Sequence, residues 1–187
     1  MTAPSRPNRA EIAGAVGRTV PDLIRPNLLV LFCGINPGLY SAATGHHFAR
    51  PGNRFWPALH RAGFTDRVFG AWEERELLER GYGITNLVAR STSAAAELGF
   101  QELRAGRGRL LRKVRRYQPR WVAVLGIGAF RAAFGDPGAE PGRQASRLGP
   151  AGLWVLPNPS GLNANHQLVD LARAFRALRL AAAAGLR

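Results

Sequence analysis

The chain has 187 residues, and 46% of them are hydrophobic, enough for one sizeable core and too many for a disordered chain. Lys and Arg number 26 against 12 Asp and Glu, so the formal net charge of +14 favours a polyanionic partner, nucleic acid first. The single cysteine excludes an intramolecular disulfide and a multi-cysteine metal site, and no apolar run approaches the roughly 20 residues of a membrane span. Only Lys113 is a lysine, so codon bias in a GC-rich genome is an alternative reason for the arginine excess. Without an apolar signal-peptide segment, we expect a cytoplasmic protein that associates with the nucleoid through DNA.

The order of apolar runs and helical patterns predicts an α/β fold. Residues 1–26 are expected to form a basic N-terminal arm with a short helix near 10–16, and residues 27–187 a single α/β domain. Apolar runs at 28–33, 83–88, 121–125 and 153–156 end at turn residues, as strands buried on both faces do. Helical patterns begin near Asn53 and cover 72–80, 110–117, 129–134 and 167–183, whereas the Gly- and Pro-rich stretch 135–152 is expected to be a surface loop. Strands that alternate with helices predict a layered fold with a mostly parallel sheet.

Two strands of this predicted sheet lead into Asn-Pro turns. Residues 34–39 read GINPGL and residues 157–163 read PNPSGLN, and ligands bind beyond the carboxyl ends of such strands. Neither segment has the spacing of a dinucleotide fingerprint or a P-loop. An Asn-Pro-Gly turn alone is usually only a turn. However, His46, His47, Phe48 and Asn53 follow closely, and amide groups read base edges while aromatic faces stack on bases.

These segments resemble a known family of DNA repair enzymes. Residues 34–39, 41–42, 45–48 and 51–56 are similar to the first motif of the mismatch-specific uracil/thymine DNA glycosylases, the Mug/TDG branch of the uracil-DNA glycosylase superfamily. Residues 158–162 are similar to the second motif, the intercalation loop, and 63–65 and 154–157 also match. The resemblance covers about residues 28–180. It implies a three-layer α/β/α fold around a central four-stranded, mostly parallel sheet.

The resemblance also implies roles for individual residues. Asn36 matches the asparagine that positions the attacking water, and no cofactor or metal is implied. The backbones of Ile35 and Phe48 match those that contact the flipped base, and the Phe48 ring matches one that stacks on it. The implied base pocket consists of Ile35, Gly38, Ser41, Phe48 and Asn158. The implied wedge and DNA contacts are Ser160, Gly161, Leu162, Asn163, Asn53, Arg54 and Arg50.

The expected activity is therefore a monofunctional DNA glycosylase that acts on G·U or G·T mispairs in double-stranded DNA after base flipping. Uracil is the expected substrate, and thymine or damaged pyrimidines stay open. An amide is not basic, so Asn36 can only orient water, and we expect a slow enzyme, below the ~10 s⁻¹ typical of enzymes. We expect a monomer without membrane attachment. A catalytically weak mismatch- or lesion-binding module is the alternative, and a hydrolase of free nucleotides is a third reading that the high positive charge disfavours.

Three other clusters have plainer interpretations. His46 and His47 are adjacent and point in different directions, so they do not form a metal site on their own. The basic stretch 107–120 is either a solvated helical face or a set of phosphate contacts outside the site. Four glutamates alternate with arginines at helical spacing and are expected on a solvated helix: Glu73, Glu74, Glu76 and Glu79.

Overall fold

A five-stranded sheet forms the centre of the computed structural model, which describes residues 5–161 and 166–184. Its strands are β1 (Val30–Gly34), β2 (Tyr82–Asn86), β3 (Trp121–Leu125), β4 (Gly142–Leu148) and β5 (Ala151–Leu156). The strand order is β2-β1-β3-β5-β4, and every pair is parallel except β4 with β5. The carboxyl ends of β1, β2, β3 and β5 therefore meet at one edge of the sheet.

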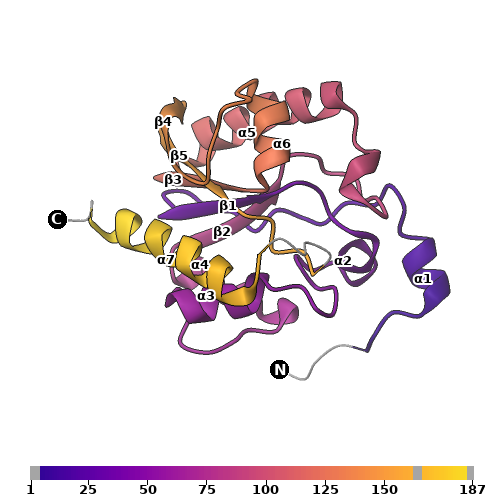
Figure 1. The fold of residues 1–187 in the computed structure, drawn as a ribbon. Coiled ribbons are helices and arrows are strands. Elements are labelled where there is room, and N and C mark those ends of the chain that lie inside the picture. The colour runs from indigo at the N-terminus through magenta and orange to yellow at the C-terminus, as the bar shows by residue number, and fades with distance from the viewer. Residues whose placement is uncertain (1–4, 162–165, 185–187) are drawn as a thin grey trace.

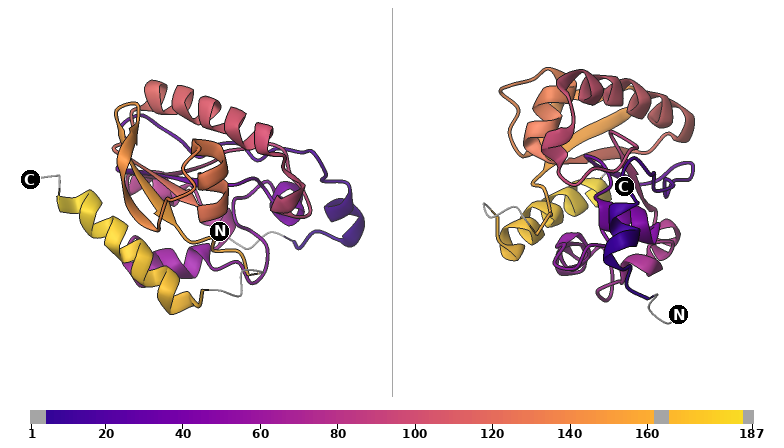
Figure 2. Two further views of the ribbon diagram at one scale, coloured as in Figure 1. Left: turned by 45° about the horizontal axis from the view of Figure 1, so that its top comes forward. Right: turned by 90° about the vertical axis from the view of Figure 1, so that its right-hand side faces the viewer.

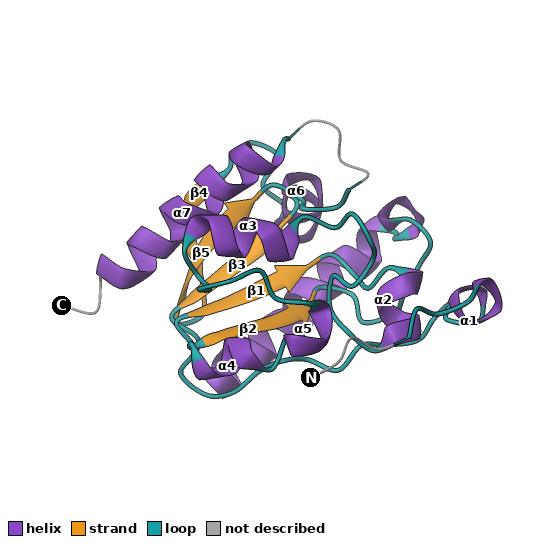
Figure 3. Ribbon diagram, turned by 90° about the horizontal axis from the view of Figure 1, so that it is seen from below, coloured by secondary structure: helices purple, strands orange, loops and turns teal. Residues whose placement is uncertain are grey.

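Helices cover both faces of this sheet. On one face lie α5 (Phe100–Tyr117) and α6 (Ile127–Phe134), and on the other α3 (Phe55–Ala62), α4 (Glu76–Glu79) and α7 (Leu168–Ala184) (Figures 1 and 2). The shorter helices α1 (Arg9–Ala13) and α2 (Leu39–Thr44) lie beside the sheet, and two 3-10 turns cover Ala71–Glu73 and Ala95–Glu97. Figure 3 shows α3, α4 and α7 in front of the sheet. Among the described residues, no helix combines the length and apolarity needed to cross a membrane.

The strands are buried on both faces because their side chains alternate between two cores. Val30 and Phe32 of β1 point to the core under α3 and α7, where Phe32 packs against Phe55 and Phe175. Leu31 and Cys33 point to the core under α5 and α6. The continuous apolar runs that predict these strands thus reflect a sheet between two helical layers, and the three-layer α/β/α fold is confirmed.

The structure differs from the sequence prediction at four elements. The sheet has a fifth strand, β4, inside the stretch expected to be a loop. Its sequence, GRQASRL, has an exposed and polar pattern because it is an edge strand held mainly by backbone pairing with β5. Helix α5 begins ten residues earlier than expected, α2 was not expected at all, and the predicted helix 72–80 is divided into a 3-10 turn and α4.

The N-terminal segment packs against the sheet near β2. The backbones of Leu23 and Ile84 exchange two hydrogen bonds of 2.9 and 2.8 Å. Asp22 accepts hydrogen bonds from Thr85 of β2 at 2.7 Å and pairs with Lys113 of α5 at 2.6 Å. This three-residue network links the segment to both a strand and a helix.

Candidate functional site

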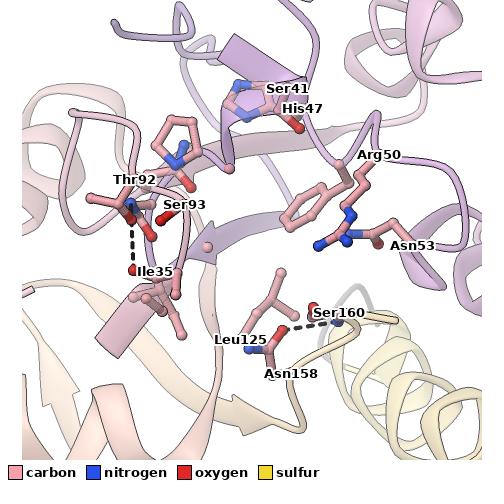
Figure 4. Close-up of a pocket in the computed structure, with 18 residues that line it drawn as sticks. Ile35, Ser41, His47, Arg50, Asn53, Thr92, Ser93, Leu125, Asn158 and Ser160 are labelled. Carbon is pink, nitrogen blue, oxygen red and sulfur yellow. Dashed lines mark hydrogen bonds between the residues drawn. The ribbon is translucent and has the colours of Figure 1, made fainter. Parts of the chain in front are cut away.

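A cavity of about 320 Å³ opens at the carboxyl edge of the sheet. This volume is at the small end of the roughly 300–1,000 Å³ range of ligand pockets, so it suits one small ring. Arg50 and Asn53 lie on one side of it, Thr92 and Ser93 lie opposite, and Asn158 and Ser160 line another side (Figure 4). The remaining lining residues are Gly34, Ile35, Asn36, Pro37, Gly38, Ser41, His47, Phe48, Asn86, Ala94, Ala95 and Leu125.

Glycine at the end of β1 lets other groups approach the cavity floor. A Cβ on Gly34 would lie 2.5 Å from Oδ1 of Asn86 and 3.4 Å from the Phe48 ring. Any side chain at this position would therefore displace the Asn86 side chain. The same edge contains Gly126, whose φ of +132° favours glycine and which lies against Ile35 and Asn158. Gly126 has no side chain between Ile35 and Asn158, so the two motif loops can approach each other there.

The amide of Asn36 is held in one orientation. Its Nδ2 donates to the carbonyl oxygen of Arg90 at 3.1 Å and to Oγ1 of Thr92 at 2.7 Å. The Arg90 carbonyl oxygen can only accept a hydrogen bond. The Thr92 hydroxyl donates its own proton to the carbonyl oxygen of Ala94 at 2.8 Å, so it also accepts from Asn36. Both partners therefore require the nitrogen of the amide. The oxygen Oδ1 remains as the acceptor of the amide, and Asn36 lines the cavity.

The loop that carries Phe48 is fixed on both sides. Glu74 is 9% exposed, and its carboxylate accepts from His47 N–H at 2.9 Å and contacts Nδ1 of His46 at 3.0 Å. The Ser41 hydroxyl accepts from Ala49 N–H at 3.1 Å. The prediction that Glu74 lies on a solvated face is wrong, because its carboxylate is the acceptor of this buried loop.

Phe48 itself has an unusual backbone and ring position. Its φ of +54° lies in the left-handed region, which costs a non-glycine residue roughly 1–3 kcal/mol and persists only where the surroundings enforce it. Its ring stacks on buried Phe55 with centroids 4.1 Å apart, and the ring also lines the cavity. The Phe48 N–H makes no hydrogen bond to any described residue. Phe55 thus covers one face of the Phe48 ring.

His47 is a neutral side chain of the cavity wall. Its Nε2 lies 2.9 Å from the carbonyl oxygen of Pro21, which can only accept, so the Nε2 atom bears the hydrogen. Burial lowers the pKa of His47, and the Glu74 carboxylate opposes that shift. The imidazole therefore adds no positive charge to the cavity at neutral pH.

The second motif loop is attached to the first by Arg54. Its guanidinium donates to the carbonyl oxygens of Ser160, at 2.5 Å, and His166, and its backbone N–H donates to Pro159 at 3.0 Å. Arg54 is not among the residues that line the cavity, and its role as a DNA contact stays a prediction. Asn158 accepts from Ser160 N–H at 3.0 Å, which shapes the start of the loop.

The structure brings most of the predicted site residues together. Asn36 and all five expected base-pocket residues line one cavity, with Arg50, Asn53 and Ser160 at its walls. Gly161 is exposed and packs so closely on Gly52 that a Cβ would lie 2.6 Å from the Gly52 carbonyl oxygen. Two of the predicted wedge residues, Leu162 and Asn163, lie outside the described residues.

Sequence reasoning gave no role to the loop that follows β2. Thr92 is buried, and its N–H donates to the Pro37 carbonyl at 3.2 Å, which places this loop beside the first motif. The available signal was the polar run 91–93 beyond a strand that ends at the carboxyl edge of a parallel sheet.

The cavity contains polar groups but no carboxylate. Among the lining residues that the structure describes, none is Asp or Glu, and Arg50 is the one cation at neutral pH. The same described residues contain no cluster of three or more His, Cys, Asp or Glu positioned to hold a metal ion. The arrangement can orient a water, stack a ring and bind base edges with amides.

The chain was compared with models of known protein families. The model described as the Uracil DNA glycosylase superfamily matches residues 21–181. The match includes both motif loops, the loop that follows β2, and all five strands.

Proposed function

Because the chain belongs to the uracil-DNA glycosylase superfamily, we propose that it is a monofunctional glycosylase that hydrolyses the N-glycosidic bond of a mismatched uracil in DNA. Membership of the superfamily indicates glycosylase activity on uracil and DNA as the partner. The Mug/TDG branch, G·U and G·T specificity and base flipping are our proposals, based on the motifs and on the cavity that they build.

The observation that carries the proposal is the orientation of the Asn36 amide. With Nδ2 committed to Arg90 and Thr92, Oδ1 accepts a hydrogen bond from water and directs the water oxygen at the sugar. An amide takes no proton at neutral pH, so the reaction depends on positioning rather than on a general base. A cavity whose described lining contains no carboxylate is consistent with a slow hydrolase.

The reaction breaks the bond between C1′ of the sugar and N1 of the base, and the electron pair leaves with the base. The water oxygen forms the new bond to C1′, and its proton passes to solvent or to the departing base. The ring of Phe48 stacks on the base, and the uncommitted N–H of Phe48 is a donor for a base carbonyl on which negative charge develops. This donor stabilises the leaving group.

The preference for a mismatch follows from the cost of extrusion. A base inside the duplex stack must leave it to reach a cavity of about 320 Å³, and extrusion costs a few kcal/mol, least for a mispaired base. Leu162 and Asn163 are proposed to fill the space that the base leaves, as apolar wedges do in proteins that bend DNA. Arg50 at the cavity wall is proposed to contact a phosphate of the extruded strand.

The experiment is single-turnover base release from labelled duplexes with G·U, A·U and G·T pairs and from single-stranded DNA with uracil. Release from G·U that falls at least 100-fold in Asn36→Ala supports the proposal, and the other substrates define its specificity. Gln101→Ala, which truncates an exposed amide on α5, is the matched control. Tight G·U binding without release would support the alternative of a lesion-binding module, and equal rates on all substrates would contradict mismatch specificity.

A further inference from the structure

The solvent-exposed side of α5 carries five arginines, and none of them lines the cavity. Arg104, Arg107, Arg112, Arg115 and Arg116 are exposed. At 3.6 residues per turn, Arg104, Arg112 and Arg115 follow one stripe about 80° wide, and Arg107 and Arg116 flank it on opposite sides. The stripe from Arg104 to Arg115 is about 16 Å long at 1.5 Å per residue. The positions between these arginines include Ala105 and Gly108, which leave the guanidinium groups uncovered. We call these five arginines the basic ridge.

In the part of the chain that the structure describes, no ion pair with an acidic residue neutralises the basic ridge. Among the ion pairs of the described residues, none includes any of its five arginines. The one acid on α5, Glu102, pairs with Arg90 at 2.7 Å, and Lys113 is directed to Asp22. Instead, three ridge guanidiniums lie over aromatic rings, and the Phe100 ring beneath Arg104 is 52% exposed. A solvated helix usually intersperses both signs of charge, and this face does not.

The C-terminal half of α5 contacts the turn between β4 and β5, and β4 carries two further arginines. A Cβ on Gly149 would lie 3.2 Å from Leu111 and 3.9 Å from Cγ of Arg115, so the β4–β5 turn packs directly on the helix. Arg147 flanks this turn, and it lines a hollow together with Arg143, which lies over the Trp121 ring at 5.3 Å. Ala181 and Ala184 of α7 also line this hollow, so it lies on the α7 side of the sheet and is separate from the basic ridge.

The basic ridge lies away from the cavity because of the order of the strands and helices in the fold. Helix α5 follows β2, which ends at the carboxyl edge of the sheet, and precedes β3, which begins at the opposite edge. Its C-terminal half and the β4–β5 turn therefore lie at the amino edge, as Figure 1 shows for α5 above the sheet. A duplex bound at the cavity mouth occupies the other edge.

We propose that the basic ridge is a second nucleic-acid surface, which binds the phosphate backbone of a separate duplex segment while the cavity face engages a first. Guanidinium groups pair with phosphate oxygens in a fork geometry, and each strand of duplex DNA carries one charge per roughly 3.4 Å of axis, so about 16 Å of stripe faces roughly five phosphates of one strand. The ridge lacks the amides and acids that read bases, so binding is independent of sequence. Two occupied surfaces let the protein pass directly from one DNA segment to another.

The test compares two triple variants with the same net charge. Arg112→Gln/Arg115→Gln/Arg116→Gln removes the C-terminal half of the ridge. Arg61→Gln/Arg75→Gln/Arg176→Gln removes three exposed arginines from the opposite face. These three arginines form no ion pair with any residue that the structure describes. Thermal unfolding checks that both are folded. Each protein is captured on an immobilised duplex, and the amount of a second, labelled duplex retained per captured protein is measured between 50 and 200 mM salt.

We expect the ridge variant to retain at least fivefold less of the second duplex than the wild-type protein. The slope of log K against log[salt] for undamaged duplex should fall by about 3, because each lost phosphate contact contributes roughly 0.9. The control variant should keep both values. Equal losses in the two variants would show an effect of net charge alone and overturn the proposal, as would no loss in either. The proposal also fails if the ridge variant loses binding to phosphatidylserine vesicles and keeps the second duplex. None of these measurements requires base release, so they stand apart from the test of the glycosylase.

Discussion

Thr92→Val tests whether the orientation of the Asn36 amide controls the rate. The substitution conserves volume and removes the hydroxyl that accepts from Nδ2 at 2.7 Å, while the bond to Arg90 at 3.1 Å remains. One neutral hydrogen bond contributes about 0.5–1.5 kcal/mol net, so the productive orientation loses about that much of its preference. At 1.36 kcal/mol per factor of ten, the single-turnover rate should fall by about 2- to 12-fold. The single-turnover rate of Asn36→Ala, which removes the water-binding oxygen itself, should fall further.

Thr92→Ser is the matched variant because it keeps the hydroxyl between Asn36 and Ala94. It should retain a rate within about twofold of the wild-type protein, and the affinity of all variants for an uncleavable G·U duplex should change little. The assay is single-turnover base release at saturating protein, with affinity measured separately by fluorescence anisotropy. A wild-type rate in Thr92→Val, or a serine variant as slow as the valine variant, would refute the reasoning.

Three further predictions concern groups around the site and in the core. Glu74→Ala leaves the buried His47 N–H without its acceptor and should lower the free energy of unfolding, measured in urea, by about 1–3 kcal/mol. Glu74→Gln should lower the free energy of unfolding by less, because the amide oxygen can still accept. Equal stability of the wild-type protein and both variants would contradict the role of this carboxylate. Because the folded state lowers the pKa of His47 below its ordinary value of 6.5, the unfolded chain binds a proton first, so stability should be full above pH 6.5 and fall as the pH decreases below it. His47→Gln should flatten that dependence in melts between pH 5 and 7.5, and an unchanged slope would assign it to other groups. Burial raises the pKa of the Cys33 thiol, so native protein should react with iodoacetamide only as fast as it unfolds, and rapid labelling at pH 8 would contradict this.

Much of the fold follows from local patterns that tertiary structure does not overrule. The apolar runs at 28–33, 121–125 and 153–156 predict β1, β3 and β5 because strands between two helical layers are apolar on both faces. The edge strand β4 could not be found in this way, since its polar residues 143–147 carry no signal and its pairing partner is defined only in three dimensions. Likewise, the first ten residues of α5 include Gly106 and Gly108, which weaken a helix pattern. A Cβ on Gly106 would lie 2.7 Å from the Leu87 carbonyl oxygen, so the close approach of these two segments requires glycine.

The sequence by itself determined that the two motif loops share one cavity, because each motif follows directly on a strand, and parallel strands bring their carboxyl ends to one edge. It identified Asn36, Phe48 and Asn158 as residues of one site. Only the tertiary structure decided how those groups are held. Thr92 fixes the amide of Asn36 from 56 residues away, and Glu74 fixes the Phe48 loop by a bond to His47 from 27 residues away. Such partners are far apart in the chain, and a hydrogen bond depends on ångström-scale positions that no local pattern specifies.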